Sequence, residues 1–214
     1  YLATKIGGRL SGSPQAKQAV DWATKAMYAA GADTVNLQPC MVPHWVRGKK
    51  EKCILSSSKL KLNKELKCTA LGSSVASKAG GIKAKVIEVH SFKELEKLGE
   101  REIKGNIVFY NVFFNQAHVH PGTAYGETVK YRGRGASHAA KFGALACMVR
   151  SMSSVADDEP HTGNMSYDTT ISKEKIPSIA ISFLAADALA DALKKDKDLT
   201  VLIETHCQTL PDEP

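Results

Sequence analysis

The stretch that most constrains the fold of this chain lies between Tyr131 and Tyr167. It contains an alanine-rich segment without a helix breaker, then Gly143 where a helix C-cap is expected, then the continuously apolar run 144–149. Such a run is typical of a strand buried on both faces, and a polar loop follows it. Helix, glycine, buried strand and polar loop predict an α/β unit, whose ligand contacts usually lie on loops beyond the strands.

The other periodicities predict an α/β domain, a mixed sheet with short antiparallel strands and flanking helices, preceded by an N-terminal helix. Ser13 is a good N-cap and Pro14 suits the first position of that helix. Short, patchily alternating segments in a lysine-rich region favour antiparallel strands with one solvated face. We expect strands at 33–38, 52–55, 59–62, 66–70, 82–89, 107–114, 144–149, 178–182 and 199–204, helices at 14–30, 91–99, 136–142 and 183–194, and a loop at 115–128.

The charge pattern bears on partners. The net charge is +7, and the basic excess lies between Arg47 and Lys67. A nucleic-acid surface is one interpretation, but aromatic residues are scarce there and lysine outnumbers arginine, which favours a solvated face. We therefore expect no nucleic-acid partner. We also expect no membrane span, because no apolar run approaches the ~20 residues that one needs.

The cysteine spacing argues against a zinc ribbon or a thioredoxin motif, because the five cysteines form no C-x-x-C pair. A disulfide framework is not expected in a chain of 214 residues. One pair among Cys40, Cys53 and Cys68, which are near in sequence, could form in an oxidising compartment. Cys147 lies in the apolar run and is interpreted as a small core residue.

Three polar clusters could carry chemistry. Ser137 and His138 lie in a degenerate nucleophile-elbow pattern, but the preceding stretch is a poor buried strand, so the first turn of a helix is favoured. His118 and His120 could offer two metal ligands, without evident third and fourth ones. The acidic triplet 157–159 lacks the spacing of a calcium loop. We therefore assign no catalytic and no metal-ligating residue.

His161 has a different setting. It follows Pro160 on the long loop after the buried strand, with Arg150 and Tyr167 expected nearby. A functional and a structural role are equally open. No nucleophile or base pair accompanies it, so any role would be contact or closure rather than bond breaking.

A series of short motifs extends along nearly the whole chain, each weak alone. They are Ile6–Ser13, Ala19–Thr24, Val42–Gly48, Leu71-Gly72 with Ser74, Gly105–Asn111, Tyr131-Arg132, Gly135–Ala140, Pro160–Gly163 with Tyr167, Lys175–Pro177 and the closing LPDEP. In order and spacing the set resembles the N-terminal half of zinc-dependent exopeptidases similar to plasma glutamate carboxypeptidase and related bacterial aminopeptidases.

The resemblance implies an architecture. In that family a helical N-terminal segment leads into a protease-associated domain, an α/β insert that caps the active site, and a di-zinc catalytic domain follows. Here it implies a helical segment at 1–40 that packs on the catalytic domain, a protease-associated domain at 41–206, and a linker at 207–214. The family's His-x-Asp and Glu-Glu elements do not occur in this sequence. We therefore expect no cofactor in this chain, zinc in the catalytic domain, and no peptide hydrolysis by this chain alone.

The expected function is that of a non-catalytic cap that shapes and closes a substrate cleft. Its contacts would come from His161, Thr162, Tyr167 and Arg47. Its partners would be its own C-terminal catalytic domain and a peptide substrate, with a homodimer open. The parent would be secreted or periplasmic, although the N-terminus lacks the apolar region of a signal peptide.

The alternative is a free-standing protein-interaction module, whose N-terminal helix should have its apolar stripe covered. Aminopeptidase and carboxypeptidase activity both stay open for the parent protein.

Overall fold

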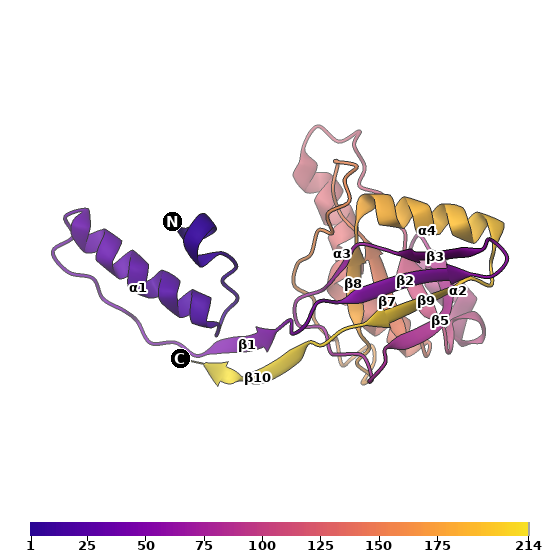
Figure 1. The fold of residues 1–214 in the computed structure, drawn as a ribbon, viewed down its shortest axis with the longest axis horizontal. Helices are drawn as coiled ribbons and strands as arrows, with labels where there is room; N and C mark the ends of the chain where they lie inside the picture. The colour runs from indigo at the N-terminus through magenta and orange to yellow at the C-terminus, as the bar shows by residue number, and fades with distance from the viewer. Residues whose placement is uncertain (214) are drawn as a thin grey trace. The chain divides into compact units, whose positions relative to one another are not determined.

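The computed structural model describes residues 1–213, which form two compact units. The small unit consists of residues 1–46 and the segment that begins at Gln208, and the large unit is Arg47–Cys207 (Figure 1). None of the helices in the described part of the chain combines the length and the apolar character that crossing a lipid bilayer requires.

The small unit holds one helix and a two-stranded ribbon. Its elements are the π-helical turn η1 (Leu2–Ile6), helix α1 (Pro14–Ala29) and the antiparallel strands β1 (Val42–Val46) and β10 (Gln208–Glu213). The ribbon joins two segments from opposite ends of the sequence.

Helix α1 starts as the sequence predicts. The Ser13 hydroxyl accepts a hydrogen bond from the Ala16 amide at 3.2 Å, and Pro14 occupies the first turn. The predicted strand at 33–38 is wrong, because these residues are irregular and join neither sheet among the described residues. Alternation alone does not make a strand where no partner strand is available to pair with.

The large unit is an α/β domain built on an eight-stranded mixed sheet within the described residues. The strand order is β3-β2-β9-β5-β6-β7-β8-β4; β5 to β8 are parallel neighbours, and the pairs at both ends of the order are antiparallel. This confirms the predicted mixed sheet with flanking helices. The elements are β2 (Lys52–Ser57), β3 (Leu62–Glu65), β4 (Cys68–Ala70), β5 (Ile82–Val89), α2 (Phe92–Ile103), β6 (Ile107–Tyr110), α3 (Pro121–Lys141), β7 (Ala146–Arg150), β8 (Ser178–Ile181), α4 (Phe183–Lys195) and β9 (Thr200–Glu204).

The two edges of the sheet belong to one short segment, residues 62–70, which we call the seam. β3 and β4 stand at opposite ends of the strand order, yet only Leu66 and Lys67 lie between them. The Leu66 amide donates to the Cys53 carbonyl of β2 at 2.8 Å, and the Ser182 amide beyond β8 donates to the Lys67 carbonyl at 3.0 Å. The sheet must therefore curl until its edges meet, which leaves few unpaired edge groups.

The curled sheet packs an apolar cluster on each face. All four residues of β6 are buried; Ile107 and Phe109 face the cluster under α4, whereas Val108 and Tyr110 face the cluster under α2 and α3. Alternate side chains of a strand point to opposite faces, so a strand between two helical layers is apolar throughout. This explains why the run 144–149, most of which is β7, is continuously apolar.

The largest difference from the sequence-based expectation is helix α3. It runs from Pro121 to Lys141, whereas we expected a loop to 128 and a helix only at 136–142. Pro121 indicated the start of this helix, because proline is favoured at the first helical position. Packing of the buried face of α3 outweighs the low helix propensity of its glycines. Gly143 follows the helix with φ +77°, which confirms its predicted place at the C-terminal cap.

Several smaller boundaries also moved; the strand expected at 107–114, for example, ends at Tyr110. β3 begins at Leu62 rather than 59, because a turn precedes it in which Lys61 has φ +49°. Helix α2 does not stop near Gly99: it breaks there, with φ +62°, and continues to Ile103, whose side chain is fully buried. Burial of that side chain favours the extra turn.

We predict that two neighbouring glycines of α3 respond oppositely to alanine. A Cβ at Gly135 would lie 2.8 Å from the Tyr110 ring, so Gly135→Ala is expected to destabilise the fold by roughly 1–3 kcal/mol through overpacking. A Cβ at Gly133 would meet nothing within 4 Å, so Gly133→Ala is expected to stabilise it by about 0.5–1 kcal/mol. Urea unfolding of both variants measures the difference, and equal effects would contradict this packing.

Candidate functional site

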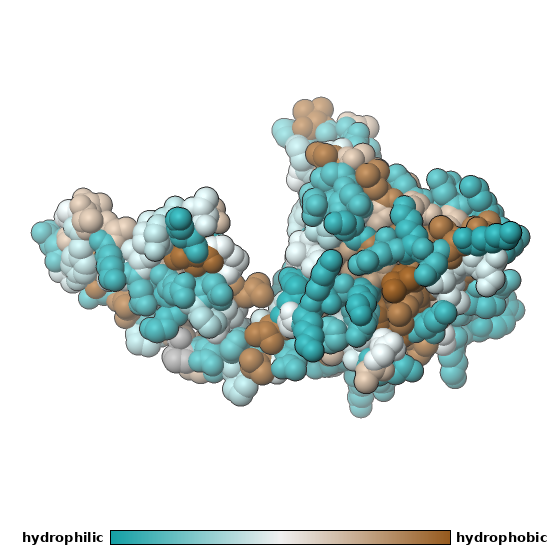
Figure 2. Space-filling view, viewed as in Figure 1, coloured by the Kyte–Doolittle hydropathy of each residue, from teal (hydrophilic) through white to brown (hydrophobic). Residues whose placement is uncertain are grey.

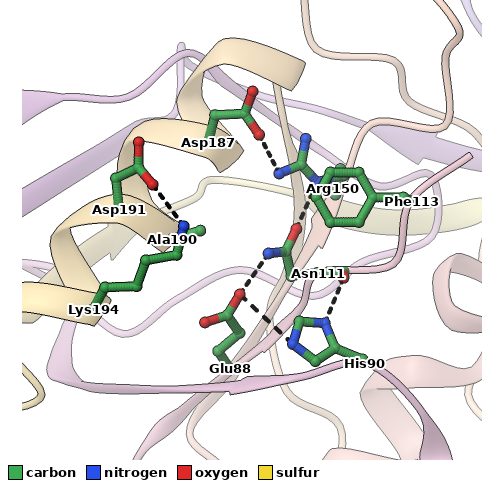
Figure 3. Close-up of a pocket in the computed structure, with 9 residues that line it drawn as sticks. All are labelled: Glu88, His90, Asn111, Phe113, Arg150, Asp187, Ala190, Asp191 and Lys194. Atoms are coloured by element: carbon green, nitrogen blue, oxygen red, sulfur yellow. Dashed lines mark hydrogen bonds and ion pairs between the residues drawn. The ribbon is translucent and has the colours of Figure 1, made fainter.

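The carboxyl ends of β5, β6 and β7 lie at the same edge of the sheet, because the three strands are parallel neighbours. This is where α/β sheets usually bind ligands. The edge lines a pocket of about 440 Å³. Its polar side chains come from three strand ends and from α4; they are Glu88, His90, Asn111, Arg150, Asp187, Asp191 and Lys194 (Figure 3).

Arg150 is the centre of this edge. Its side chain is 1% exposed, and its guanidinium donates to Asn111 Oδ1 at 2.6 Å and to Asp187 Oδ1 at 2.5 Å. The rings of Phe113 and Phe183 lie 4.2 and 4.8 Å from its central carbon. A buried cation is tolerated when it is paired and hydrogen-bonded, and aromatic faces add further attraction.

The same hydrogen bonds continue to β5. The Asn111 side-chain amide donates to Glu88 Oε1, and the ring Nδ1 of His90 lies 2.8 Å from the Asn111 carbonyl (Figure 3). Lys194 pairs with Asp191 at 2.9 Å on the exposed face of α4. These charges satisfy one another, so we interpret the network as a clamp on three strand ends rather than as a reactive centre.

Two loops, residues 111–120 and 151–177, follow strand ends that the clamp joins, and we call them the edge loops. Gln116 Nε2 donates to the Ser154 carbonyl at 3.0 Å and ties one loop to the other. Three large apolar side chains on them are exposed: Phe113 by 56%, Val119 by 90% and Val155 by 58%. Figure 2 shows hydrophobic surface at the end of the large unit where the chain enters α3. Apolar groups gathered on loops favour a contact surface.

Arg47 and Thr162, two of the four contact residues proposed from the sequence, meet at the end of the seam. Thr162 Oγ1 donates to the Ala70 carbonyl at 3.1 Å, and Arg47 Nη1 donates to the same carbonyl. Arg47 Nη1 also donates to Thr69 Oγ1 at 2.9 Å and lies 3.6 Å from Glu51 Oε1. Both side chains thus hold an edge loop and the start of the large unit against β4.

Tyr167 also bridges segments. Its hydroxyl donates to the Ile176 carbonyl at 2.7 Å and accepts from the Val75 amide at 3.0 Å. Burial raises the pKa of the Tyr167 phenol, so it stays a neutral donor well into alkaline solution. Because this hydroxyl already donates one hydrogen bond and accepts another within the protein, its role is to anchor the loop.

His161 is the one of the four whose side chain projects from the loop without a close tether. Its backbone amide donates to Ser151 Oγ at 2.7 Å, which fixes the loop beside the carboxyl end of β7. Its ring is exposed, with Nε2 3.7 Å from Asp157 Oδ2. The expected neighbour Arg150 is occupied within the clamp instead.

The polar clusters considered in the sequence analysis make contacts with other residues of the protein. Ser137 is buried inside α3, where its hydroxyl accepts from the Asp168 amide at 2.8 Å, and the His138 ring stacks on Phe92 at 3.9 Å. The strand–turn–helix of a nucleophile elbow is absent from this described stretch, and Ser137 and His138 are helical as favoured. They lie near the end of α3, however, and not in its first turn. His118 Nε2 lies 2.9 Å from Glu127 Oε1. Across residues 1–213 no group of three or more His, Cys, Asp or Glu side chains could hold a metal ion.

Sequence reasoning missed Glu88, Asn111 and Asp187. The first two stand at the carboxyl end of a strand or directly after one, the position at which parallel sheets collect polar side chains. Asp187 had no such signal, because its role depends on how α4 packs on the sheet.

The chain is similar along almost its whole length to carboxypeptidase Q of vertebrates. It is 36% identical over 207 residues to the Xenopus laevis protein and 33% identical over 211 residues to the Homo sapiens protein. These matches span 97% and 99% of this chain but 41% and 42% of the relatives, so the chain spans less than half the length of the curated relatives it matches. No protein-family model matches the chain.

Solved structures agree with this likeness. A peptidase M28 precursor from Shewanella amazonensis has a TM-score of 0.90 at 32% identity, over 99% of this chain and 46% of that one. A zinc aminopeptidase from Bacillus subtilis has a TM-score of 0.59 at 18% identity, over 99% of this chain and 43% of that one. At that identity the second likeness shows a shared fold.

We predict that the clamp depends on Arg150. Arg150→Met keeps much of the side-chain volume but removes charged hydrogen bonds to Asn111 and Asp187, so the fold is expected to lose about 2–3 kcal/mol. Lys194→Met is the matched control in the same pocket; it breaks an exposed pair and is expected to change nothing measurable. Urea unfolding compares the two, and an Arg150→Met protein as stable as the control would refute the clamp.

Proposed function

We propose that the chain is the non-catalytic cap part of a zinc-dependent exopeptidase, with the large unit as its protease-associated domain. The observation that carries this proposal is the match to carboxypeptidase Q and to an M28 peptidase over nearly all of this chain but less than half of theirs. The fold supports it, since an α/β domain with a mixed sheet and flanking helices is what we expected of a protease-associated domain.

The chemistry of bond cleavage is assigned to the rest of the protein. A di-zinc hydrolase needs several converging carboxylates and histidines. The described residues offer no such group, so no zinc fits here and no catalytic step is assigned to this chain. What its residues supply in this proposal is the shape of the cleft and the exclusion of water from it. Whether the parent removes amino- or carboxyl-terminal residues is then decided by the catalytic part.

In this role one of the four contact residues touches the substrate, and the other three hold its loop in place. The exposed ring of His161 contacts the peptide substrate. Thr162 and Arg47 fix the loop to Ala70, and Tyr167 fixes it near Val75, so His161 is presented on a preorganised loop. A secreted or periplasmic location of the parent protein is part of the same proposal, whereas a homodimer stays open.

Helix α1 favours a larger protein over a free-standing interaction module. None of the residues of α1, all of them described, is buried, and Val20, Met27 and Tyr28 are each about half exposed. A module that stands alone should cover such a helix. In the proposal α1 packs on the catalytic domain.

The decisive experiment is peptide hydrolysis by the full-length protein and by residues 1–214 alone. The full-length protein is expected to cleave peptides with free termini, to stop when a chelator removes zinc, and to recover when zinc is restored. Residues 1–214 are expected to cleave nothing. Chelator-sensitive hydrolysis by residues 1–214 would overturn the proposal.

We predict that His161→Ala in the full-length enzyme lowers kcat/KM for peptides by about tenfold, equivalent to about 1.4 kcal/mol of transition-state stabilisation. The thermal midpoint should stay unchanged, because the ring is exposed. Lys97→Ala, at an exposed position of α2, is the control and should leave kcat/KM unchanged. Unaltered kcat/KM and substrate preference in His161→Ala would remove His161 from the cleft.

We predict that the double variant Val20→Gln, Met27→Gln destabilises the full-length protein by roughly 2–4 kcal/mol, because both side chains become buried there. In residues 1–214 alone the same variant should have little effect, since both side chains are already about half exposed. Thermal unfolding of the four proteins measures this. The same response in both lengths would contradict docking of α1.

A further inference from the structure

Two cysteines face each other across the seam. Cys53 lies on β2, which pairs with the first strand of the seam, and Cys68 begins β4, the second strand of the seam. Continuing the β2–β3 register by one step places Leu66 opposite Cys53, and the Leu66 amide donates to the Cys53 carbonyl at 2.8 Å. Cys68 is the next residue along the seam that points to the same face, since side chains alternate along a strand.

Both side chains point into one apolar cluster. Cys53 is fully buried, and Cys68 is partly buried and packs against the same cluster. Straight antiparallel strands would keep such diagonal neighbours about 7–8 Å apart. Here the strand leaves β2 after Leu66 and pairs with β8 from Cys68 onward. A hydrogen bond with Cys68 is the largest cause that raises the pKa of the Cys53 thiol.

We propose that Cys53 and Cys68 form a disulfide that fastens the seam of the curled sheet. In the structure the five cysteines, all within residues 1–213, carry free thiols, so the bond would be added by oxidation. Its place is specific, because it would tie β2 directly to β4, which are otherwise joined here through the backbone of residues 58–67. This inference concerns the chain's own sulfur chemistry and stands or falls independently of the exopeptidase proposal.

The remaining cysteines have no comparable partner in the described structure. Cys40 belongs to the small unit and is exposed, whereas Cys147 and Cys207 are buried elsewhere in the large unit. Cys147 lies on β7 and faces the cluster under α2 and α3, the opposite face of the sheet from Cys53. The fold thus selects one pair from the three that the sequence left open.

The oxidant is a small or protein disulfide, such as oxidised glutathione. The Cys68 thiolate, the more exposed of the two, attacks one glutathione sulfur and releases the first glutathione thiolate. The Cys53 thiolate then attacks Cys68 Sγ, releases the second glutathione thiolate and forms the protein disulfide. Two electrons pass to the oxidant, and the two cysteine protons end on the two glutathione thiols.

The order of these steps has a kinetic consequence. The hydrogen bond with the Cys68 thiol and burial together raise the pKa of Cys53, so its thiolate is scarce in the folded protein. Burial of Cys53 persists after Cys68 has reacted, so the second step is slow after folding and faster while the seam is still open. We expect the bond to form chiefly during folding in an oxidising solution.

Peptide mapping without reduction tests the proposal on the full-length protein. The protein is refolded in a reduced and oxidised glutathione buffer, free thiols are alkylated, and trypsin is added. Cleavage after Lys52, Lys59, Lys67 and Lys78 isolates peptides 53–59 and 68–78, each with one cysteine. We expect these two peptides joined, with two hydrogens fewer than their summed masses, in the wild-type protein and in Cys40→Ser.

A stability measurement provides the second test. Reduction with dithiothreitol is expected to lower the thermal midpoint of the wild-type protein by on the order of 5–10 °C. Cys68→Ser should show no response to dithiothreitol. Recovery of both peptides as alkylated free thiols, or of Cys68 joined to another cysteine, would overturn the proposal. A joined pair with an unchanged midpoint would overturn the role of the bond as a fastener. The wild-type map decides the pairing even if Cys68→Ser fails to fold.

Discussion

The large unit depends on one constraint: its sheet begins and ends in the same nine-residue segment, 62–70. A flat sheet would keep β3 and β4 seven strands apart, so backbone pairing on both sides of Leu66 and Lys67 forces the curl. The curl in turn lets α4 cover one face while α2 and α3 cover the other. The parallel strands β5 to β8 then bring their carboxyl ends to one edge, where the polar clamp and the edge loops lie.

The clamp shows why a charged side chain ends a buried strand. Arg150 is the last residue of β7, and Asn111, Asp187 and two aromatic rings surround it. Those partners stabilise a desolvated cation that would otherwise be costly. The neighbouring residue Ser151 holds the amide of His161, so the position of the exposed histidine depends on the same strand end. A loop held this way presents its side chains with little loss of entropy on contact.

The sequence predicted what depends on local pattern. The strands at 82–89 and 178–182, the helix at 183–194 and the glycine after α3 follow from alternation, capping and conformational preference. It failed where distant partners decide. Residues 33–38 alternate in hydrophobicity but have no neighbouring strand to pair with. Helix α3 tolerates its glycines because its buried face packs on β6 and β7. At the candidate site, the sequence placed His161 on a loop. It could not show that Arg47 and Thr162 share the Ala70 carbonyl, since 23 and 92 residues separate them from it.

The ribbon of β1 and β10 shows how the large unit is connected to the rest of the chain. Val46, the last residue before it, is the register partner of Gln208, the first residue after it. A two-residue turn could connect such partners, so the whole of Arg47–Cys207 occupies the place of the loop in a β-hairpin. A host fold that supplies that hairpin could gain or lose the entire unit without rerouting either strand. Topologically, the large unit is an insertion between the two paired strands β1 and β10.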